Sequence, residues 1–267
     1  MITIISPAKN MRKPNIWKEK IDKSELTNPK LYEKSNKILS HMKEYITEEI
    51  QDIMKIKEDL AQLNYARFQK MKPIKKDSVV IKDKIPSIFA YDGIQYKNIS
   101  PEDISKEGLL FLNEHLRIIS GFYGILRPFD IIDEYRLEMQ TKVKIYEKNN
   151  LYTFWNTSIA EEISNDLNNE GIVLNLASKE YSKTVEKTFN SKESKIKLIN
   201  CTFKVEKGEK LKVESTASKK ARGKMVKYIA ENKIDDLESI KKFKEDDFAY
   251  SEKYSTDKEI VFIKKVY

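Results

Sequence analysis

Residues 116–141 hold the densest group of side chains in the chain that could do chemistry. Gly121 and Gly124 lie three positions apart in an otherwise apolar stretch, and a backbone without Cβ atoms can turn sharply and approach a ligand closely. Residues 134–138 then place a tyrosine, an arginine and two carboxylates within five positions. Glycines beside charged and aromatic groups are more typical of a binding site than of a buried core.

Arginine usage also points to this region. The sequence has 50 basic residues, and only six are arginines: Arg12, Arg67, Arg117, Arg127, Arg136 and Arg222. Because a planar guanidinium can bind a phosphate or a carboxylate through two parallel hydrogen bonds, arginine in a lysine-rich chain indicates anion recognition. The alternative is structural, with these arginines paired to acidic neighbours, namely Asp130, Asp133, Glu134 or Glu138.

A second basic segment covers residues 215–230 and contains five basic groups and no acid. Its apolar residues recur at helical spacing, which predicts a helix with Lys219, Lys220 and Arg222 near its N-terminus. The helix dipole favours negative charge at that end, so the segment is interpreted as a phosphate contact surface. An ordinary solvated helix face is the alternative.

Two predicted strand exits carry further polar groups. Residues 1–6 read as a buried strand followed by a loop with Lys9, and residues 171–178 read as a buried strand that ends at Ser178. Ligands of α/β folds bind beyond the carboxyl ends of strands, where Lys9 would meet an anion. Ser178 begins the next helix, so it would either line an anion pocket or simply cap that helix.

Three carboxylates offer a different chemistry. Asp92 lies in an Asp-Gly turn with Tyr96 close by, Glu138 ends the polar group near residue 136, and Glu180 lies in the first turn of a predicted helix. Carboxylates placed among basic groups favour a site in which negative and positive charges are both present. In such a site they would act as acid/base groups or as metal ligands.

Composition excludes several classes of protein. Two histidines and one cysteine cannot form a usual zinc site, and Cys201 lies in an alternating strand-like segment typical of a buried thiol. A single cysteine fits a reducing cytoplasm. Residues 1–6 lack the basic region and apolar stretch of a signal peptide, and without an apolar run of about 18 residues no membrane span is expected. No cofactor and no metal are predicted, although a magnesium site made of carboxylates alone stays open. The net charge of +8 favours polyanionic partners.

The order of the predicted elements is typical of an α/β protein. Helices expected at 28–54, 59–71, 100–113, 156–170 and 215–230 alternate with short apolar strands, including one at 116–119. Short strands are also expected at 79–81 and 143–146, and an antiparallel pair at 195–203 and 210–214. No linker or repeat interrupts the pattern, so a single domain spanning residues 1–267, with a mixed sheet flanked by helices, is predicted.

Seven segments of the chain resemble, in order, the signature of the YaaA family of peroxide stress proteins. They are Ile5–Lys9, Ala90–Gly93, Ser120–Asp130, Tyr135–Met139, Leu151–Trp155, Asn175–Tyr181 and Lys220–Gly223. The resemblance implies a bacterial cytoplasmic protein that limits intracellular iron, and with it oxidative damage. It also implies an α/β fold with a basic cleft, DNA binding and a helix–hairpin–helix-like element, for which Gly121–Gly124 would be the hairpin.

Three hypotheses follow. The first is a DNA-binding stress protein without a metal, whose contacts with phosphates and unpaired bases would come from Lys9, Ser120, Gly121, Tyr123, Gly124, Arg127, Tyr135, Arg136, Ser178, Lys219, Lys220 and Arg222. The second is an enzyme acting on a nucleotide or nucleobase-like molecule through Asp92, Glu138 and Glu180. The third is an iron-linked regulator or scaffold, for which the sequence offers no ligand cluster.

Overall fold

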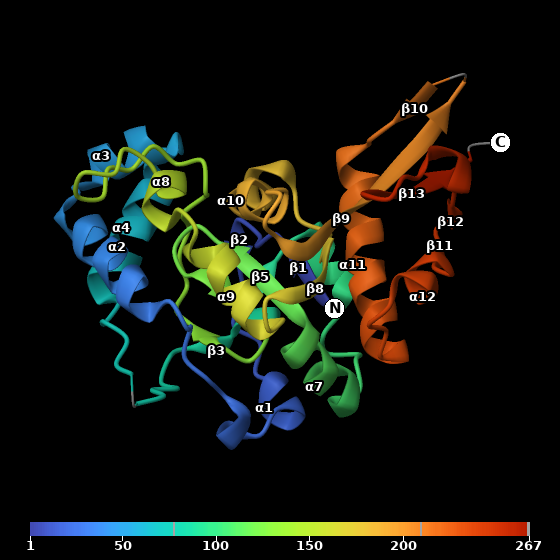
Figure 1. Ribbon diagram of the computed structural model, residues 1–267. Coiled ribbons are helices and arrows are strands. Elements are labelled where there is room, and N and C mark those ends of the chain that lie inside the picture. The colour runs from blue at the N-terminus through green and yellow to red at the C-terminus, as the bar shows by residue number, and fades with distance from the viewer. Residues whose placement is uncertain (77, 209, 266–267) are drawn as a thin grey trace.

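The computed structural model describes residues 1–76, 78–208 and 210–265, and a large mixed sheet runs through it (Figure 1). Within these residues nine strands form the sheet. They are β1 (Ile2–Ile5), β5 (Leu116–Ser120), β6 (Gly124–Leu126), β8 (Glu170–Asn175), β9 (Lys195–Lys207), β10 (Lys210–Lys212), β11 (Lys244–Glu245), β12 (Phe248–Tyr250) and β13 (Glu259–Lys264). The predicted α/β class with a mixed sheet is confirmed.

Five strands of the sheet are parallel and lie in the spatial order β5-β1-β8-β9-β13. The chain passes from β1 to β5 on one side and later returns to β8 on the other side of β1. This is the strand order 2-1-3-4-5 of doubly wound sheets, in which a crevice opens between the first and third strands at their carboxyl ends. The topology therefore places a ligand site beyond Ile5 and Asn175.

Antiparallel strands extend the sheet at both edges. β6 pairs with β5, while β12 and β11 follow β13 at the opposite edge. β9 is long enough to pair with β8 through its first half and with β13 through its second half. Its end forms the predicted antiparallel pair with β10, which extends away from the body of the molecule (Figure 1).

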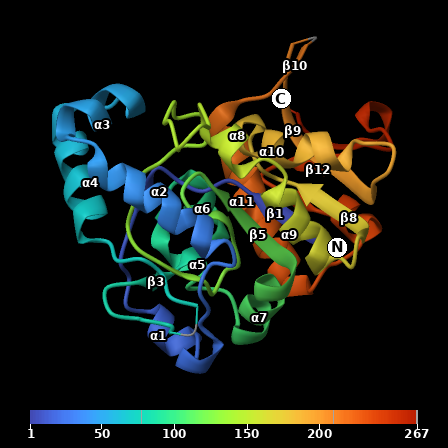
Figure 2. The ribbon, with the colours of Figure 1, turned by 60° about the vertical axis from the view of Figure 1, so that its left-hand side comes forward.

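Helices cover both faces of the sheet. α9 (Ser158–Asp166) and α10 (Lys179–Phe189) pack together on one face, and α7 (Lys106–His115) and α11 (Ser215–Asn232) pack together on the other (Figure 1, Figure 2). α6 (Ile94–Ile99) lies along α11. The apolar faces of these helices and of the strands form one continuous core.

The remaining elements lie around this centre. They are α1 (Trp17–Lys20), α2 (Tyr32–Glu44), α3 (Thr47–Met54), α4 (Glu58–Lys70), α5 (Ser87–Ala90), α8 (Leu151–Trp155), α12 (Leu237–Lys241), the 3-10 turns η1 (Lys23–Glu25) and η2 (Glu252–Tyr254), and the strands β2 (Asn10–Met11), β3 (Ile85–Pro86), β4 (Tyr91–Asp92) and β7 (Ile131–Ile132). No helix within the described part of the chain is both long and apolar enough to cross a membrane.

Some predicted elements differ from the structure. The helix expected at 28–54 is two helices, α2 and α3, because Tyr45 is extended and the Glu49 carboxylate accepts the Ile46 N–H at 2.9 Å to start a new helix. The short strands expected at 79–81 and 143–146 are wrong, since both segments are loops. In the helix expected from residue 100, Ser100 is left-handed and α7 begins only after Ser105, whose side chain accepts the Gly108 N–H.

Candidate ligand-binding cavity at the carboxyl edge of the sheet

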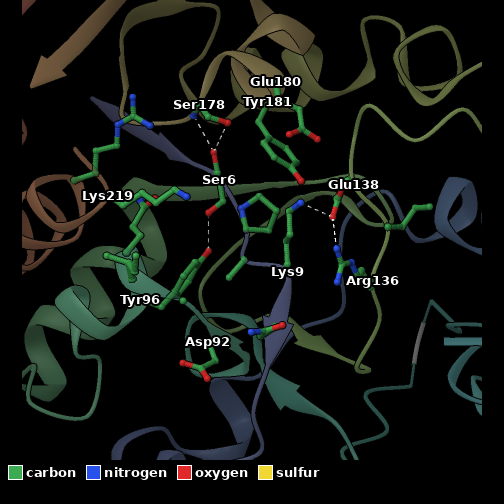
Figure 3. Close-up of a pocket in the computed structure, with 18 of the residues that line it drawn as sticks. Ser6, Lys9, Asp92, Tyr96, Arg136, Glu138, Ser178, Glu180, Tyr181 and Lys219 are labelled. Carbon is green, nitrogen blue, oxygen red and sulfur yellow. Dashed lines mark hydrogen bonds and ion pairs between the residues drawn. The ribbon is translucent and has the colours of Figure 1, made fainter. Parts of the chain in front are cut away.

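A cavity of about 340 Å³ lies at the carboxyl ends of β1 and β8, where the topology places a ligand site (Figure 3). The loop after β1, the start of α6, residues 135–138, the start of α10 and the start of α11 form its walls. Of the residues singled out in the sequence, the cavity is lined by Lys9, Asp92, Tyr96, Tyr135, Arg136, Glu138, Ser178, Glu180, Lys219 and Arg222. The structure thus brings together side chains from the DNA-binding and the enzyme hypotheses.

The serines at the two strand exits hold this edge of the sheet together. The Ser178 N–H donates to Ser6 Oγ at 2.8 Å, and the Ser6 hydroxyl lies 3.2 Å from Ser178 Oγ. The Tyr96 hydroxyl donates to the Ser6 carbonyl oxygen at 3.0 Å, which ties α6 to β1. Ser6 was missed in the sequence, although its position directly after the first buried strand is the same signal that selected Lys9.

Lys9, Arg136 and Glu138 form an ion-pair group on one side of the cavity (Figure 3). The Glu138 carboxylate lies 3.1 Å from Lys9 Nζ and 3.0 Å from Arg136 Nη2. Glu180 lies beside this group and accepts the Gln140 N–H at 3.3 Å. Burial, together with the negative charge of Glu138, raises the pKa of Glu180. This side of the cavity can therefore bind ligand groups that donate hydrogen bonds and ligand groups that accept them, and the Glu180 carboxyl can hold a proton.

α11 reaches the cavity because a glycine lets it cross α6 at close range. A Cβ on Gly223 would lie 2.2 Å from the Gln95 carbonyl oxygen, so a larger residue would push the two helices apart. Lys219 and Arg222, three positions apart on α11, consequently line the cavity. Burial lowers the pKa of Arg222, and no described residue forms an ion pair or a hydrogen bond with its guanidinium.

Gln95 is a further lining residue that the sequence did not reveal. Its side chain is 8% exposed, and its Nε2 has no hydrogen-bond partner among the described residues. Buried polar atoms in proteins are nearly always paired, and Gln95 Nε2 is among the few described exceptions, with Arg222 Nε another. Its only sequence signal is its place two positions after the Asp92-Gly93 turn.

The glycine segment selected first in the sequence has a different role. Gly121–Tyr123 form the tight turn between β5 and β6, so strands rather than helices flank it, and the helix–hairpin–helix assignment to this segment is wrong. A Cβ on Gly121 would lie 2.4 Å from the Leu137 carbonyl oxygen, and Gly124 has φ +73° against the Trp155 ring. The missing Cβ atoms make room for the chain itself.

The side chains of that turn are buried with partners. Ser120 Oγ accepts the Tyr123 N–H at 2.9 Å and lies 2.6 Å from the Tyr135 hydroxyl. The Tyr123 hydroxyl accepts the Asp133 N–H at 3.0 Å. Ser120 and Tyr123 are fully buried, and none of the residues 120–124 lines the cavity. They support the loop that carries Tyr135 and Arg136 instead of contacting a ligand.

Arg127 and Lys220 also lie outside the cavity. Arg127 and Arg117 each contact Asp166 of α9 at 2.7 Å, which corresponds to the structural alternative with a partner that the sequence did not suggest. Burial would raise the pKa of Asp166, but Arg117, Lys30 and Arg127 lower it to about 2. Lys220 is exposed on α11 and does not line the cavity.

Among residues 1–76, 78–208 and 210–265, no group of three or more His, Cys, Asp or Glu side chains is arranged to hold a metal ion. Cys201 is buried in β9, as its alternating surroundings indicated.

Comparison with known sequences identifies the family. The family profile described as "Peroxide stress protein YaaA" matches residues 1–254. The chain belongs to the YaaA family. The resemblance found in the seven segments is thereby confirmed, and membership of the family supports a role in the response to peroxide.

Relatives within the family match over their whole length. The chain is 41% identical over 265 residues to a UPF0246 protein of Clostridioides difficile strain 630, covering 99% of this chain and 100% of that protein. It is 42% identical over 264 residues to a UPF0246 protein of Ligilactobacillus salivarius, with 99% and 100% coverage. A UPF0246 protein of Crocosphaera subtropica is 34% identical over 266 residues, again with 99% and 100% coverage.

Proposed function

We propose that this YaaA-family protein binds DNA during peroxide stress. The observation that carries the proposal is the charge pattern of α11. Lys219, Lys220 and Arg222 have no acidic partner among the described residues, whereas Lys224 and Lys227 further along the helix are paired with carboxylates. Unpaired cations at the start of a helix, beside a cavity, form a surface that suits the phosphate backbone.

The cellular outcome proposed for this binding is the one that the family resemblance implies. Binding would accompany the limitation of intracellular iron and of oxidative damage to DNA in the cytoplasm. The remaining basic groups of the cavity, Lys9 and Arg136, are held by Glu138 and would contribute less to phosphate binding than the α11 residues.

The test is a salt series. Fluorescence anisotropy of labelled duplex, bubble and single-stranded DNA is measured for the wild type, Lys219→Ala, Lys220→Ala and Arg222→Ala. Each phosphate contact that is lost should reduce the slope of log affinity against log salt by about 1. Lys187→Ala, a charge-matched change on α10 outside the cavity, should keep the wild-type slope. A flat salt dependence of the wild type would contradict DNA binding through phosphates.

A second function is favoured by one specific observation: Asp92, Glu138 and Glu180 meet in the same cavity as the basic residues. The cavity therefore holds acid/base groups at the switch point of a doubly wound sheet, where enzymes of this topology bind ligands. An enzyme acting on a nucleotide or nucleobase-like molecule fits this arrangement. Among the three carboxylates, Glu180 has a raised pKa suited to proton transfer.

This alternative is tested by incubating the protein with deoxynucleoside 5′-monophosphates and their nucleosides and separating the products by chromatography. Turnover that Glu180→Gln abolishes, while DNA affinity is retained, would establish the enzyme function. DNA binding without any turnover in the wild type would leave the binding function alone.

A further inference from the structure

We propose that the cavity contains a built phosphate site, formed by Gln95, Ser178, Lys219, Arg222 and the N-terminus of α10. The inference deepens the proposed function and rests on it for the source of the phosphate. That source is either the backbone of bound DNA or a free nucleotide, because both present the same charged group.

The unpartnered amide of Gln95 is the first observation that points to a ligand. Its Nε2 is buried and has no acceptor among the described residues, although the side chain lines the cavity. A buried donor without an acceptor reduces folding stability, and an anion in the cavity would supply that acceptor. Gly223 holds α11 against the Gln95 backbone, so the amide and Arg222 come from neighbouring turns of two crossing helices.

The start of α10 adds donors from a second direction. α10 has eleven residues, and the first N–H groups of any helix have no partner within it. Ser178 precedes the helix, and its Oγ accepts the Ser6 hydroxyl at 3.2 Å while its N–H donates to Ser6 Oγ at 2.8 Å. The Ser178 hydroxyl is therefore free to donate to a ligand.

α11 supplies the positive charge. Lys219 Nζ and the Arg222 guanidinium have no anionic partner among the residues described, and both side chains line the cavity. Lys219 points into the cavity from the side opposite Glu138 and Glu180 (Figure 3). Glu138 is already held by Lys9 and Arg136, whereas Glu180 lies in the first turn of α10, two residues after Ser178.

The number and directions of the donors favour phosphate over a carboxylate. A carboxylate has two oxygens in one plane, whereas a phosphate directs three or four oxygens to different sides. Here donors approach from α6, α10 and α11. The ion-pair group of Lys9, Arg136 and Glu138 on the other side would then meet the polar remainder of a nucleotide unit.

The first experiment uses inorganic phosphate, deoxyadenosine 5′-monophosphate and deoxyadenosine, each titrated into the protein by calorimetry. The wild type should bind inorganic phosphate and deoxyadenosine 5′-monophosphate, and it should not bind deoxyadenosine. Lys219→Ala and Arg222→Gln should each weaken binding about tenfold or more, the effect of losing a charged hydrogen-bond donor. Lys187→Ala should stay within about twofold of the wild type. Failure of the wild type to bind either phosphate, or equal weakening by Lys187→Ala, overturns the proposal.

A second variant separates a ligand role of Gln95 from a structural one. Gln95→Met keeps the volume and removes the unpartnered donor, so the melting temperature should stay the same or rise while phosphate affinity falls. A structural role predicts the reverse, a lower melting temperature with unchanged affinity, and that result overturns the assignment.

A competition experiment identifies the source of the phosphate. If deoxyadenosine 5′-monophosphate displaces labelled duplex DNA, the backbone occupies the site. If both bind at once, the site takes a free nucleotide. Nucleotide binding without any DNA binding would overturn the proposed function and keep the phosphate site. DNA binding by a protein that binds neither inorganic phosphate nor deoxyadenosine 5′-monophosphate would keep the proposed function and overturn the phosphate site.

Discussion

Two clusters of arginine and lysine in this molecule have opposite electrostatic states. Arg117 and Arg127 share the Asp166 carboxylate at 2.7 Å each, and Lys30 joins them at 3.1 Å. Arg222 and Lys219 at the cavity have no acid beside them within the described residues. The charges of the first cluster are paired within the fold, so this cluster contributes to the stability of the folded protein. Those of the second are not paired among the described residues, so it is the one that can bind an external anion.

The comparison shows why residue type alone does not identify a site. Both clusters contain the planar guanidinium that suits phosphate, so from residue type alone Arg127 and Arg222 are equal candidates. What separates them is a carboxylate about forty residues away in the chain, Asp166, which only tertiary structure brings to Arg127.

Removing Asp166 should have the largest effect on stability. In Asp166→Asn, the Arg117 side chain, 3% exposed, loses its anionic partner, and breaking such a buried pair costs about 3–5 kcal/mol. Urea unfolding measures the change. Glu162→Gln on the same helix removes only a more exposed pair with Lys30, at 3.4 Å, and should cost about 1 kcal/mol or less. Equal losses of unfolding free energy in the two variants would contradict the stabilising role of the Arg117–Asp166 pair.

The pH dependence of stability should also report the paired cluster. Burial raises the pKa of Asp130 to about 6, against hydrogen bonds from Thr27 and the Arg127 N–H that lower it. A carboxyl whose pKa is raised by folding binds more protons when folded, so stability is lost as the pH rises through about 6. The loss between pH 4 and pH 8 should be on the order of 2–3 kcal/mol.

The control for this prediction is Asp130→Asn, which should remove that part of the pH profile. Asp166 acts with the opposite sign, because its pKa is lowered to about 2 and its contribution disappears only as the pH falls toward that value. A wild-type unfolding free energy that rises between pH 5 and pH 7, with the same rise in Asp130→Asn, would contradict the assignment to Asp130.

The glycine turn should behave as a structural element. In Gly121→Ala the new Cβ would lie 2.4 Å from the Leu137 carbonyl oxygen, and relieving this clash should cost about 1–3 kcal/mol. DNA affinity of the folded protein should be unchanged, as anisotropy titrations would show. In Gly208→Ala a Cβ has no neighbour within 4 Å, so the unfolding free energy should fall by only about 1 kcal/mol, because of the positive φ at this position. Loss of DNA affinity in Gly121→Ala at unchanged stability would show that the turn belongs to the binding site.

The turn also marks the limit of prediction from the sequence. Local patterns predicted β1, β5, β8, α10 and α11 because buried strands and amphipathic helices have distinct periodicities. They also placed Lys9 and Ser178 at strand exits, and both residues line the cavity. What failed depends on distant contacts: the Leu137 carbonyl that explains Gly121, the Asp166 partner of Arg127, and the helix crossing that isolates Gln95.

The smallest change in stability should occur at the unpaired cluster, and it is the most informative. Arg222→Met replaces a half-buried, unpaired guanidinium by an apolar side chain of similar length, so no ion pair is broken and no carboxylate is left exposed in the core. The unfolding free energy should stay within about 1 kcal/mol of the wild type or increase. DNA affinity should fall about tenfold at low salt, because a phosphate contact is lost.

Urea unfolding and anisotropy titrations on the same preparation decide the matter. The matched variant is Arg127→Met, which removes a guanidinium from the paired cluster and leaves Asp166 Oδ1 with Lys30 alone. It should lose stability and keep its DNA affinity, the reverse of Arg222→Met. If both variants lost affinity alike, the cations would act through overall charge, and the distinction between a satisfied and an unsatisfied cluster would carry no functional meaning.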